Sequence, residues 1–327
     1  MAVIQFSQAI NQALYQLLEK DTEVFLIGQG VTSPWYVGGT TVGLVDRFGA
    51  ERVFDTPVSE NGVTGTAVGA ALAGAKPVLV FPRLDFMYYA FDQLINHAAN
   101  WHYMFGGQLS VPLVIWGIVN RGGEQAAQHA QSIQAMMMHV PGLKVVMPST
   151  PYDAKGLMIS AVTDGNPVMY IDERWLYQTK GEVPEEMYKV PLGKGVVRRE
   201  GGDVTVVATS YMVLEALKAA EALEKEEHID VEVIDPRSIK PLDKPLLLSS
   251  VKKTGRFVVV DAAWQTGGVG AELSAIVASE CFDYLKAPVA RVSLPDAPAP
   301  SSSVLEKAYY PTSKTIIKKV KETMARK

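Results

Sequence analysis

A single carboxylate stands at the start of an otherwise uncharged stretch, in the segment 59–62 (SENG) ahead of residues 62–75. Pro57 and Val58 precede it, so we expect Glu60 at a turn between a strand and a helix. Partial loss of water at such a turn favours the protonated form of a carboxyl, which suits proton transfer. The same position also suits a glutamate that only stabilises the positive end of a helix dipole, and the residues alone leave both interpretations open.

A histidine follows a glycine loop further along the chain. His129 stands in the segment 128–131 (QHAQ), after the loop signal at 121–123 (RGG). Loops that follow parallel strands carry the ligand sites of α/β sheets, and histidine titrates near neutral pH. His129 is therefore a candidate for acid–base chemistry. A loop histidine that only satisfies backbone groups is the alternative interpretation.

The glycine patterns do not match a nucleotide site. Segment 28–30 (GQG) lacks the third glycine of the dinucleotide fingerprint, and 267–270 (GGVG) has the wrong spacing. No GxxxxGK[ST] pattern is present. These absences argue against an oxidoreductase of the dinucleotide type and against a phosphoryl-transfer enzyme.

The composition excludes further classes. A single cysteine, Cys281, excludes an internal disulfide and a cysteine metal cluster, and the histidines lack the spacing of helical metal ligands. Lys and Arg total 31 against 35 Asp and Glu, a net charge of −4, which argues against nucleic-acid binding. No apolar run reaches the roughly 18–20 residues of a membrane span. The first residues show no signal pattern, so we expect a cytoplasmic protein.

The elements that must position these residues alternate between strand and helix. Short apolar strands are predicted at 24–27, 77–81, 111–117, 143–147, 168–171, 204–208, 231–234, 257–260 and 289–292. Helices are predicted from a cap at Ser7, and at 62–74, 86–104, 151–162, 212–226, 267–281 and 307–324. Apolar strands between helices indicate an α/β fold with two doubly wound, mostly parallel sheets.

The alternation is interrupted once. Residues 180–203 are rich in Gly and Pro and carry a charged run, so we interpret them as a domain junction. The 327 residues are also enough for two domains at roughly 100–200 residues each. We therefore expect domains at 1–185 and 186–327.

Several separate blocks, in the same order along the chain, carry a family resemblance. They are 52–60 (RVFDTPVSE), 67–71 (AVGAA), 85–86 with 92–96 (DF and DQLIN), 129–132 (HAQS), 141–146 (PGLKVV), 148–157 (PSTPYDAKGL) and 267–272 (GGVGAE). With these blocks the chain resembles the β subunit of the thiamin-diphosphate-dependent 2-oxoacid dehydrogenase E1 components of pyruvate, branched-chain and acetoin type. The resemblance implies a pyrimidine-binding domain followed by a transketolase C-terminal-like domain.

The resemblance also implies roles for individual residues. Glu60 falls on the glutamate that shares a proton with N1′ of the cofactor's aminopyrimidine and so promotes loss of the thiazolium C2 proton. Phe86 falls on the aromatic that packs against the pyrimidine, and His129 on a histidine near the reacting carbonyl. His139 falls at the edge of the cofactor site. Backbone carbonyls at positions that hold potassium in some relatives match Leu113, Ala161, Asp164 and Asn166.

The half of the family that holds Mg²⁺ and the diphosphate uses a GDG motif, which is absent here. The resemblance therefore implies an α-type E1 partner in an α₂β₂ assembly, with a lipoyl acyltransferase (E2) as a further partner. It implies decarboxylation of a 2-oxoacid and transfer of the acyl group to a lipoyl acceptor. A split transketolase-like or acyloin-forming carboligase, which transfers an aldehyde fragment, is the alternative.

The chain departs from the family pattern at three places. Relatives carry one or two acids after the first strand, where this chain has Gln29. Segments 116–124 and 85–89 also differ from the usual pattern. These changes leave the acceptor open, because they fall near the expected substrate channel.

Overall fold

The computed structural model describes residues 1–33 and 35–326, which form two compact units. The first unit comprises Met1–Arg121 and Met136–Leu192. The second comprises Gly122–Ala135 and Gly193–Lys327, although Lys327 itself lies outside the described residues. The predicted domains 1–185 and 186–327 place residues 122–135 in the first domain, whereas the contacts group them with the second unit. In the sequence, this segment has no strand or helix pattern of its own.

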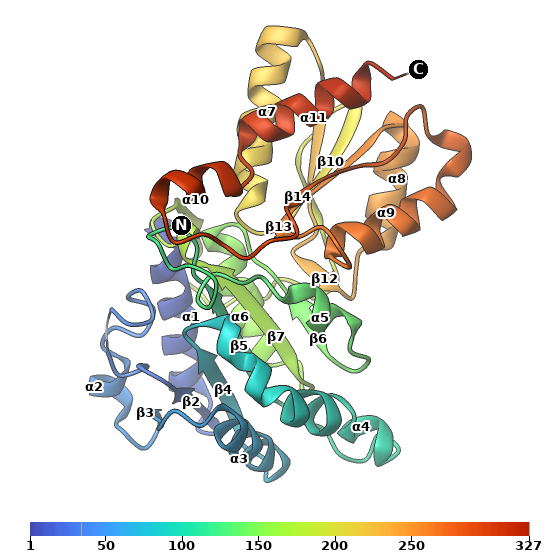
Figure 1. Cartoon of the computed structure of the whole chain (residues 1–327). Helices are drawn as coiled ribbons and strands as arrows, with labels where there is room; N and C mark the ends of the chain where they lie inside the picture. Colours follow the sequence, from blue (N-terminus) through green and yellow to red (C-terminus); the bar gives the residue numbers. More distant parts are fainter. Residues whose placement is uncertain (34, 327) are drawn as a thin grey trace. The chain divides into compact units, whose positions relative to one another are not determined.

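Figure 1 labels most strands and helices of the first unit. Its strands are β1 (Ala2–Gln5), β2 (Val24–Gly28), β3 (Val53–Asp55), β4 (Lys76–Phe81), β5 (Val114–Val119), β6 (Lys144–Val146), β7 (Val168–Glu173) and β8 (Lys180–Val183). Its helical segments are α1 (Phe6–Lys20), α2 (Leu44–Phe48), α3 (Glu60–Leu72), η1 (Leu84–Ala90), η2 (Asp92–Ala99), α4 (Trp101–Met104), α6 (Pro151–Val162) and η3 (Arg174–Leu176). Helix α5 (Gln134–His139) begins at the border with the second unit.

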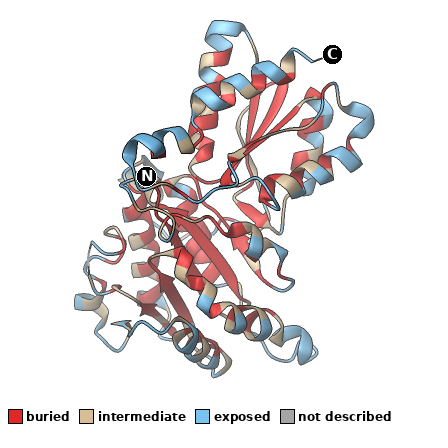
Figure 2. Ribbon diagram, viewed as in Figure 1, coloured by how far each residue is buried: buried red, intermediate tan, exposed pale blue. Residues whose placement is uncertain are grey.

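A parallel sheet forms the centre of the first unit, in the order β6-β7-β5-β4-β2-β3. Strands β5 and β7 are buried at every residue, as their continuous apolar sequences predict for a sheet covered on both faces. Figure 2 shows this burial concentrated on the strands. The predicted α/β architecture is confirmed here, and the carboxyl ends of β2, β3, β5 and β7 lie at one edge of the sheet.

The second unit repeats the architecture on a smaller scale. Its strands are β9 (Val196–Arg199), β10 (Val204–Ala208), β11 (Val231–Asp235), β12 (Ser238–Lys240), β13 (Phe257–Trp264) and β14 (Ala290–Leu294). Its helical segments are α7 (Met212–Glu227), α8 (Lys244–Thr254), α9 (Val269–Glu280), η4 (Phe282–Tyr284), α10 (Ser303–Tyr309) and α11 (Ser313–Met324). The sheet order is β14-β13-β10-β11-β9, parallel except for β9. Helices α7 and α11 cover one face and α8 and α9 the other (Figure 1).

Several predicted helix boundaries are wrong. Helix α1 begins at Phe6 and is capped by Gln5 and Gln8, while the predicted cap Ser7 is buried and donates its hydroxyl to the Tyr177 carbonyl at 3.3 Å. The predicted helix 307–324 is two helices, because Pro311 between α10 and α11 cannot continue a helix.

The junction at 180–203 contains two strands that its glycines and prolines conceal. Strand β8 pairs antiparallel with β1, and β9 pairs antiparallel with β11. Both lie at the margins of the units, where edge strands tolerate irregular sequence.

Candidate active site

The backbone that leaves β2 is held in a fixed place by both neighbouring strands. Gly28 ends β2 with φ +155°, and a Cβ there would lie 2.4 Å from the carbonyl oxygen of Val80 in β4. Only glycine tolerates this approach. On the other side, the Gly28 carbonyl accepts a bond from the Thr56 amide at 3.0 Å. The next residue, Gln29, is therefore positioned by the sheet.

Thr32 ties the loop after β2 to the end of β3. Its amide donates to Oδ1 of Asp55 at 3.2 Å, and its hydroxyl donates to Oδ2 of the same carboxylate. Asp55 is the last residue of β3, five residues before Glu60. The two chain segments that carry Gln29 and Glu60 are thus linked to each other at the strand ends.

Glu60 is the first residue of α3 and is partly exposed. The side-chain amide of Gln29 donates to its Oε1 at 3.2 Å. Among residues 1–33 and 35–326, no donor reaches Oε2. The carboxylate also lies at the positive end of the helix dipole, in a helix with no other charged residue. One oxygen is held by the protein and the other is available to a ligand.

Phe86 lies in η1, which packs against α3. The predicted single helix 86–104 is wrong: the chain forms the 3₁₀ helix η1, the π-helical segment η2 and the short α4. The reason is visible in η1, where Leu84, Met87 and Ala90 are buried at every third residue, the period of a 3₁₀ helix. The Phe86 ring, off this buried row, is partly exposed.

His129 belongs to the segment that joins the second unit. Gln134 anchors this segment by donating to Asp261 of β13 at 2.9 Å, and the Glu124 amide donates to Glu306 of α10 at 3.2 Å. His129 lies between these anchors and is partly exposed. His139, by contrast, is the exposed last residue of α5. The roles assigned to both histidines stay predictions.

The four predicted carbonyl positions lie around the amino end of β7. The Leu113 carbonyl accepts from the Val168 amide at 3.0 Å, and the Ala161 carbonyl from the Asp164 amide at 3.4 Å. Lys144 places its ammonium 2.7 Å from Oδ2 of Asp164. Asn166 follows in the turn before β7. A carbonyl oxygen has two lone pairs, so that of Leu113 can still accept a weakly held cation, whereas the Ala161 carbonyl also accepts from the Thr163 amide.

The donor set fits an aromatic nitrogen heterocycle. A carboxylate oxygen that no donor of the described residues reaches can share a proton with a ring nitrogen, and the partly exposed ring of Phe86 offers a flat apolar surface in the neighbouring element. Within the described part of the chain, no group of three or more His, Cys, Asp or Glu could hold a metal ion. In the same residues, no helix is both long and apolar enough to cross a bilayer.

A second carboxyl of the first sheet, Asp172, was not anticipated. It is fully buried near the end of β7 and accepts from Trp116 Nε1 at 3.0 Å and from the Tyr177 hydroxyl at 3.1 and 3.3 Å. Burial raises the pKa of Asp172 to about 7, against the opposing effect of these hydrogen bonds. The only signal in the sequence is a carboxyl that interrupts the apolar run of β7.

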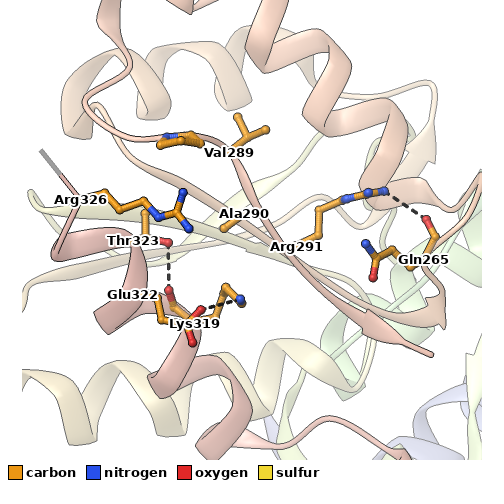
Figure 3. Close-up of a pocket in the computed structure, with 9 residues that line it drawn as sticks. Gln265, Val289, Ala290, Arg291, Lys319, Glu322, Thr323 and Arg326 are labelled. Carbon is orange, nitrogen blue, oxygen red and sulfur yellow. Dashed lines mark hydrogen bonds and ion pairs between the residues drawn. The ribbon is translucent and has the colours of Figure 1, made fainter.

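The second unit contains a cavity of about 310 Å³ between β14 and α11 (Figure 3). Lys319 on its wall is paired with Glu322 at 2.6 Å, and Arg291 donates to the Gln265 carbonyl at 3.1 Å. None of the predicted site residues lines this cavity.

Comparisons with known proteins match the chain in two parts. Residues 2–180 match the family model "Transketolase, pyrimidine binding domain", and residues 193–316 match "Transketolase, C-terminal domain". The chain is 42% identical over 327 residues to the acetoin:2,6-dichlorophenolindophenol oxidoreductase subunit beta of Bacillus subtilis, covering 96% of this chain and 95% of that protein. It is 43% identical over 319 residues to the pyruvate dehydrogenase E1 component subunit beta of Rickettsia felis, covering 98% of each.

Solved structures share the fold. A split gene transketolase, described as an inactive β4 tetramer, superposes with a TM-score of 0.81 at 23% identity over 99% of each chain. Transketolase from Leishmania mexicana superposes with a TM-score of 0.72 at 18% identity, covering 99% of this chain and 46% of that one.

Proposed function

We propose that this chain, which belongs to the transketolase family and within it to the β subunits of the pyruvate and acetoin dehydrogenase type, is the pyrimidine-holding subunit of a two-subunit thiamin-diphosphate enzyme. The enzyme would decarboxylate a 2-oxoacid and pass the acyl group to a lipoyl acceptor. When bound, thiamin diphosphate supplies the electron sink that such a decarboxylation requires.

The observation that carries the proposal is the state of the Glu60 carboxylate. It stands at the start of α3 with one oxygen held by Gln29 and the other without a donor among the described residues. In the proposed enzyme Glu60 holds a proton at N1′ of the aminopyrimidine, and Phe86 packs against that ring. This assignment needs a carboxyl with one oxygen held by the protein and the other still able to accept a hydrogen bond. The contact of Gln29 with Glu60 in the first unit supports it.

Other residues take supporting roles in the proposal. His129 would hold or deliver a proton near the reacting carbonyl, since histidine titrates near neutral pH. His139 would border the cofactor. The carbonyls of Leu113, Ala161, Asp164 and Asn166 would hold a potassium ion, for which neutral oxygen ligands are suited.

The diphosphate and its Mg²⁺ are assigned to an α-type partner in an α₂β₂ assembly. The chain has no GDG motif in its sequence. A cofactor divided in this way should bind tightly only when both subunits are present.

The test is co-purification with candidate α-type subunits, followed by calorimetric titration with thiamin diphosphate and Mg²⁺. Each subunit alone and the complex are titrated under the same conditions. We expect saturable binding by the complex that is at least about tenfold tighter than by either subunit, a difference of about 1.4 kcal/mol. Tight binding by this chain alone would refute the divided site. Absence of binding by any complex would favour a non-catalytic assembly subunit.

The acceptor has a second candidate. Gln29 and the unusual segments 85–89 and 116–124 depart from the family pattern near the expected channel, which favours an aldehyde acceptor in a carboligase as the alternative. Product analysis of the active complex with either lipoamide or a short aldehyde separates the two. Reductive acylation of lipoamide supports the lipoyl acceptor, and an acyloin or ketose product supports the aldehyde.

A further inference from the structure

We infer that Gln29 is a positioning residue, whose side-chain amide holds one oxygen of Glu60, turns the other toward the ligand and confines proton exchange to that oxygen. The inference rests on the proposed function only in naming the ligand as an aminopyrimidine. The contact that supports it, Gln29 Nε2 to Glu60 Oε1 at 3.2 Å, lies within the first unit.

The contact depends on a rigid backbone at residue 29. Gly28 cannot move toward β4 because it already lies against Val80, and its carbonyl is tied to Thr56. Three residues after Gln29, the two bonds from Thr32 to Asp55 hold the loop to β3. Gln29 itself is partly buried. The Cα of Gln29 is therefore fixed, and partial burial limits the directions that its amide can take.

In this contact the Gln29 amide is the donor and the Glu60 carboxyl is the acceptor. A glutamine NH₂ group donates hydrogen bonds but does not titrate, and a bond from it is strongest when the acceptor carboxyl is ionised. A carboxyl at position 29 would instead share one proton with Glu60, because two adjacent carboxylates resist ionising together. With Gln29, Glu60 exchanges its proton only with a ligand or with water. The residue thus makes Glu60 a single, independent proton site.

The consequence for binding follows from the geometry. The Gln29 amide leaves Oε2 without a competing donor in residues 1–33 and 35–326. Loss of the amide would free the carboxylate to rotate, and a ligand would have to order it on binding. Ordering a side chain on binding costs about 0.5–1.5 kcal/mol, which corresponds to a roughly two- to tenfold weaker affinity.

The test uses Gln29→Glu, Gln29→Ala and a matched control, Gln178→Glu. Gln178 is exposed and accepts a bond from the Gln5 amide, so a carboxylate there adds the same charge and keeps the contact. The first measurement is thermal unfolding of the full chain without cofactor at pH 5 and pH 8. Measured as the difference from wild type at the same pH, the midpoint of Gln29→Glu should be about 2 °C lower at pH 8 than at pH 5, because repulsion of about 1 kcal/mol appears as the shared proton leaves.

The double variant Gln29→Glu/Glu60→Gln isolates the pair. It should lose this pH dependence, since only one carboxylate remains, while Gln178→Glu should never show it. If Gln29→Glu behaves as Gln178→Glu does, or if the double variant keeps the pH dependence, the two side chains are not coupled and the inference is overturned.

The second measurement is thiamin diphosphate affinity and the pH dependence of turnover in the complex with the α-type partner. Gln29→Ala should weaken binding two- to tenfold, and Gln29→Glu should move the acid limb of the pH profile by about one unit. Unchanged affinity and an unchanged profile would overturn the inference even with a functional cofactor site. If the wild-type complex binds no cofactor, the proposed function fails, but unfolding still tests the coupling of Gln29 to Glu60.

Discussion

Two carboxyls of the first unit, Glu60 and Asp172, lie near the carboxyl ends of strands in one sheet but are held in opposite ways. Asp172 is fully buried and accepts from Trp116 and Tyr177, so both of its oxygens are occupied. Glu60 is partly exposed and accepts from Gln29 through one oxygen. The carboxyl of Asp172 is therefore used for hydrogen bonds within the core, whereas the carboxyl of Glu60 keeps one oxygen for a ligand.

The difference shows that a perturbed pKa is not by itself a mark of a functional carboxyl. Burial raises the pKa of Asp172 to about 7, the range suited to proton transfer near neutral pH. Yet its oxygens are used by protein donors, and its residue has no exposed surface. The availability of an oxygen, more than the size of a pKa shift, separates the candidate catalytic carboxyl from the structural one.

The sharpest test of this comparison is Glu60→Gln. The substitution keeps the volume and can keep a contact with Gln29, but it removes the ionisable oxygen. We expect turnover of the complex to fall by roughly 10²–10⁴-fold, the range for loss of a positioned acid or base. Assembly and the unfolding midpoint should be unchanged in gel filtration and calorimetry. A variant that keeps most of its turnover would show that Glu60 does not act on the cofactor.

The matching test in the interior is Asp172→Asn. At pH 5 Asp172 is protonated, and the asparagine amide likewise has one acceptor oxygen for the Trp116 N–H and one donor for the Tyr177 hydroxyl oxygen. We therefore expect a loss of only about 1 kcal/mol in the free energy of unfolding at that pH. Turnover per folded molecule should not change. Denaturant unfolding and steady-state rates measure the two effects separately.

The pH dependence of this variant tests the buried carboxyl itself. The pKa of Asp172 is raised from 3.8 to about 7, so its stabilising contribution is complete below pH 4 and is lost as the pH rises to 7. The loss is on the order of 4 kcal/mol at most, from 1.36 kcal/mol per pKa unit. Asp172→Asn should lack this slope, and its deficit against wild type should shrink between pH 5 and pH 8. Parallel profiles for the two proteins would contradict the raised pKa.

How far the sequence predicts these features depends on whether the cause is local. Helix 151–162 and strand 204–208 agree with the structure to the residue, because Pro151 and a run of mostly β-branched residues are local signals. The division of 86–104 into three segments was missed, since burial at every third residue in η1 is imposed by packing.

Within the candidate site, too, the sequence predicts the features that have a local signal and misses those that depend on strand pairing. Glu60 could be singled out because a lone carboxylate precedes an uncharged helix. Its contact with Gln29, 31 residues away, depends on the pairing of β2 with β3 and was not predictable. The role of Asp172 was likewise not predictable, because its donor Trp116 is 56 residues away on the neighbouring strand β5. Contacts between strands require the register, which composition and periodicity do not supply.

A smaller effect is expected from Tyr177→Phe, which removes only one donor from Asp172. The free energy of unfolding should fall by about 1 kcal/mol at pH 5, the net value of one hydrogen bond. The Tyr177 bond lowers the pKa of Asp172, so without it the pKa rises further and the pH-dependent loss extends above pH 7. Denaturant midpoints from pH 5 to pH 9 follow this shift. A variant whose pH profile ends where the wild-type profile does would show that Tyr177 does not act on the carboxyl.

The smallest effect concerns the support of the open carboxyl, through Thr32→Val. Valine keeps the shape and the amide bond to Asp55 but removes the hydroxyl bond. Both residues are exposed, so we expect less than about 0.5 kcal/mol of stability to be lost, as for most surface substitutions. If the tie between β2 and β3 positions Gln29, cofactor affinity should still fall about two- to threefold, or about 0.4–0.7 kcal/mol. Calorimetric titration of the complex measures it.

Thr22→Val is the matched control for that small change, because Thr22 is exposed in the turn between α1 and β2. It should alter neither stability nor affinity. A loss of affinity without a comparable loss of stability, confined to Thr32→Val, would show that the open carboxyl depends on its backbone frame. Equal behaviour of the two variants would mean that Gln29 and the sheet hold Glu60 without help from the loop, and that the buried and the open carboxyl differ only in their immediate donors.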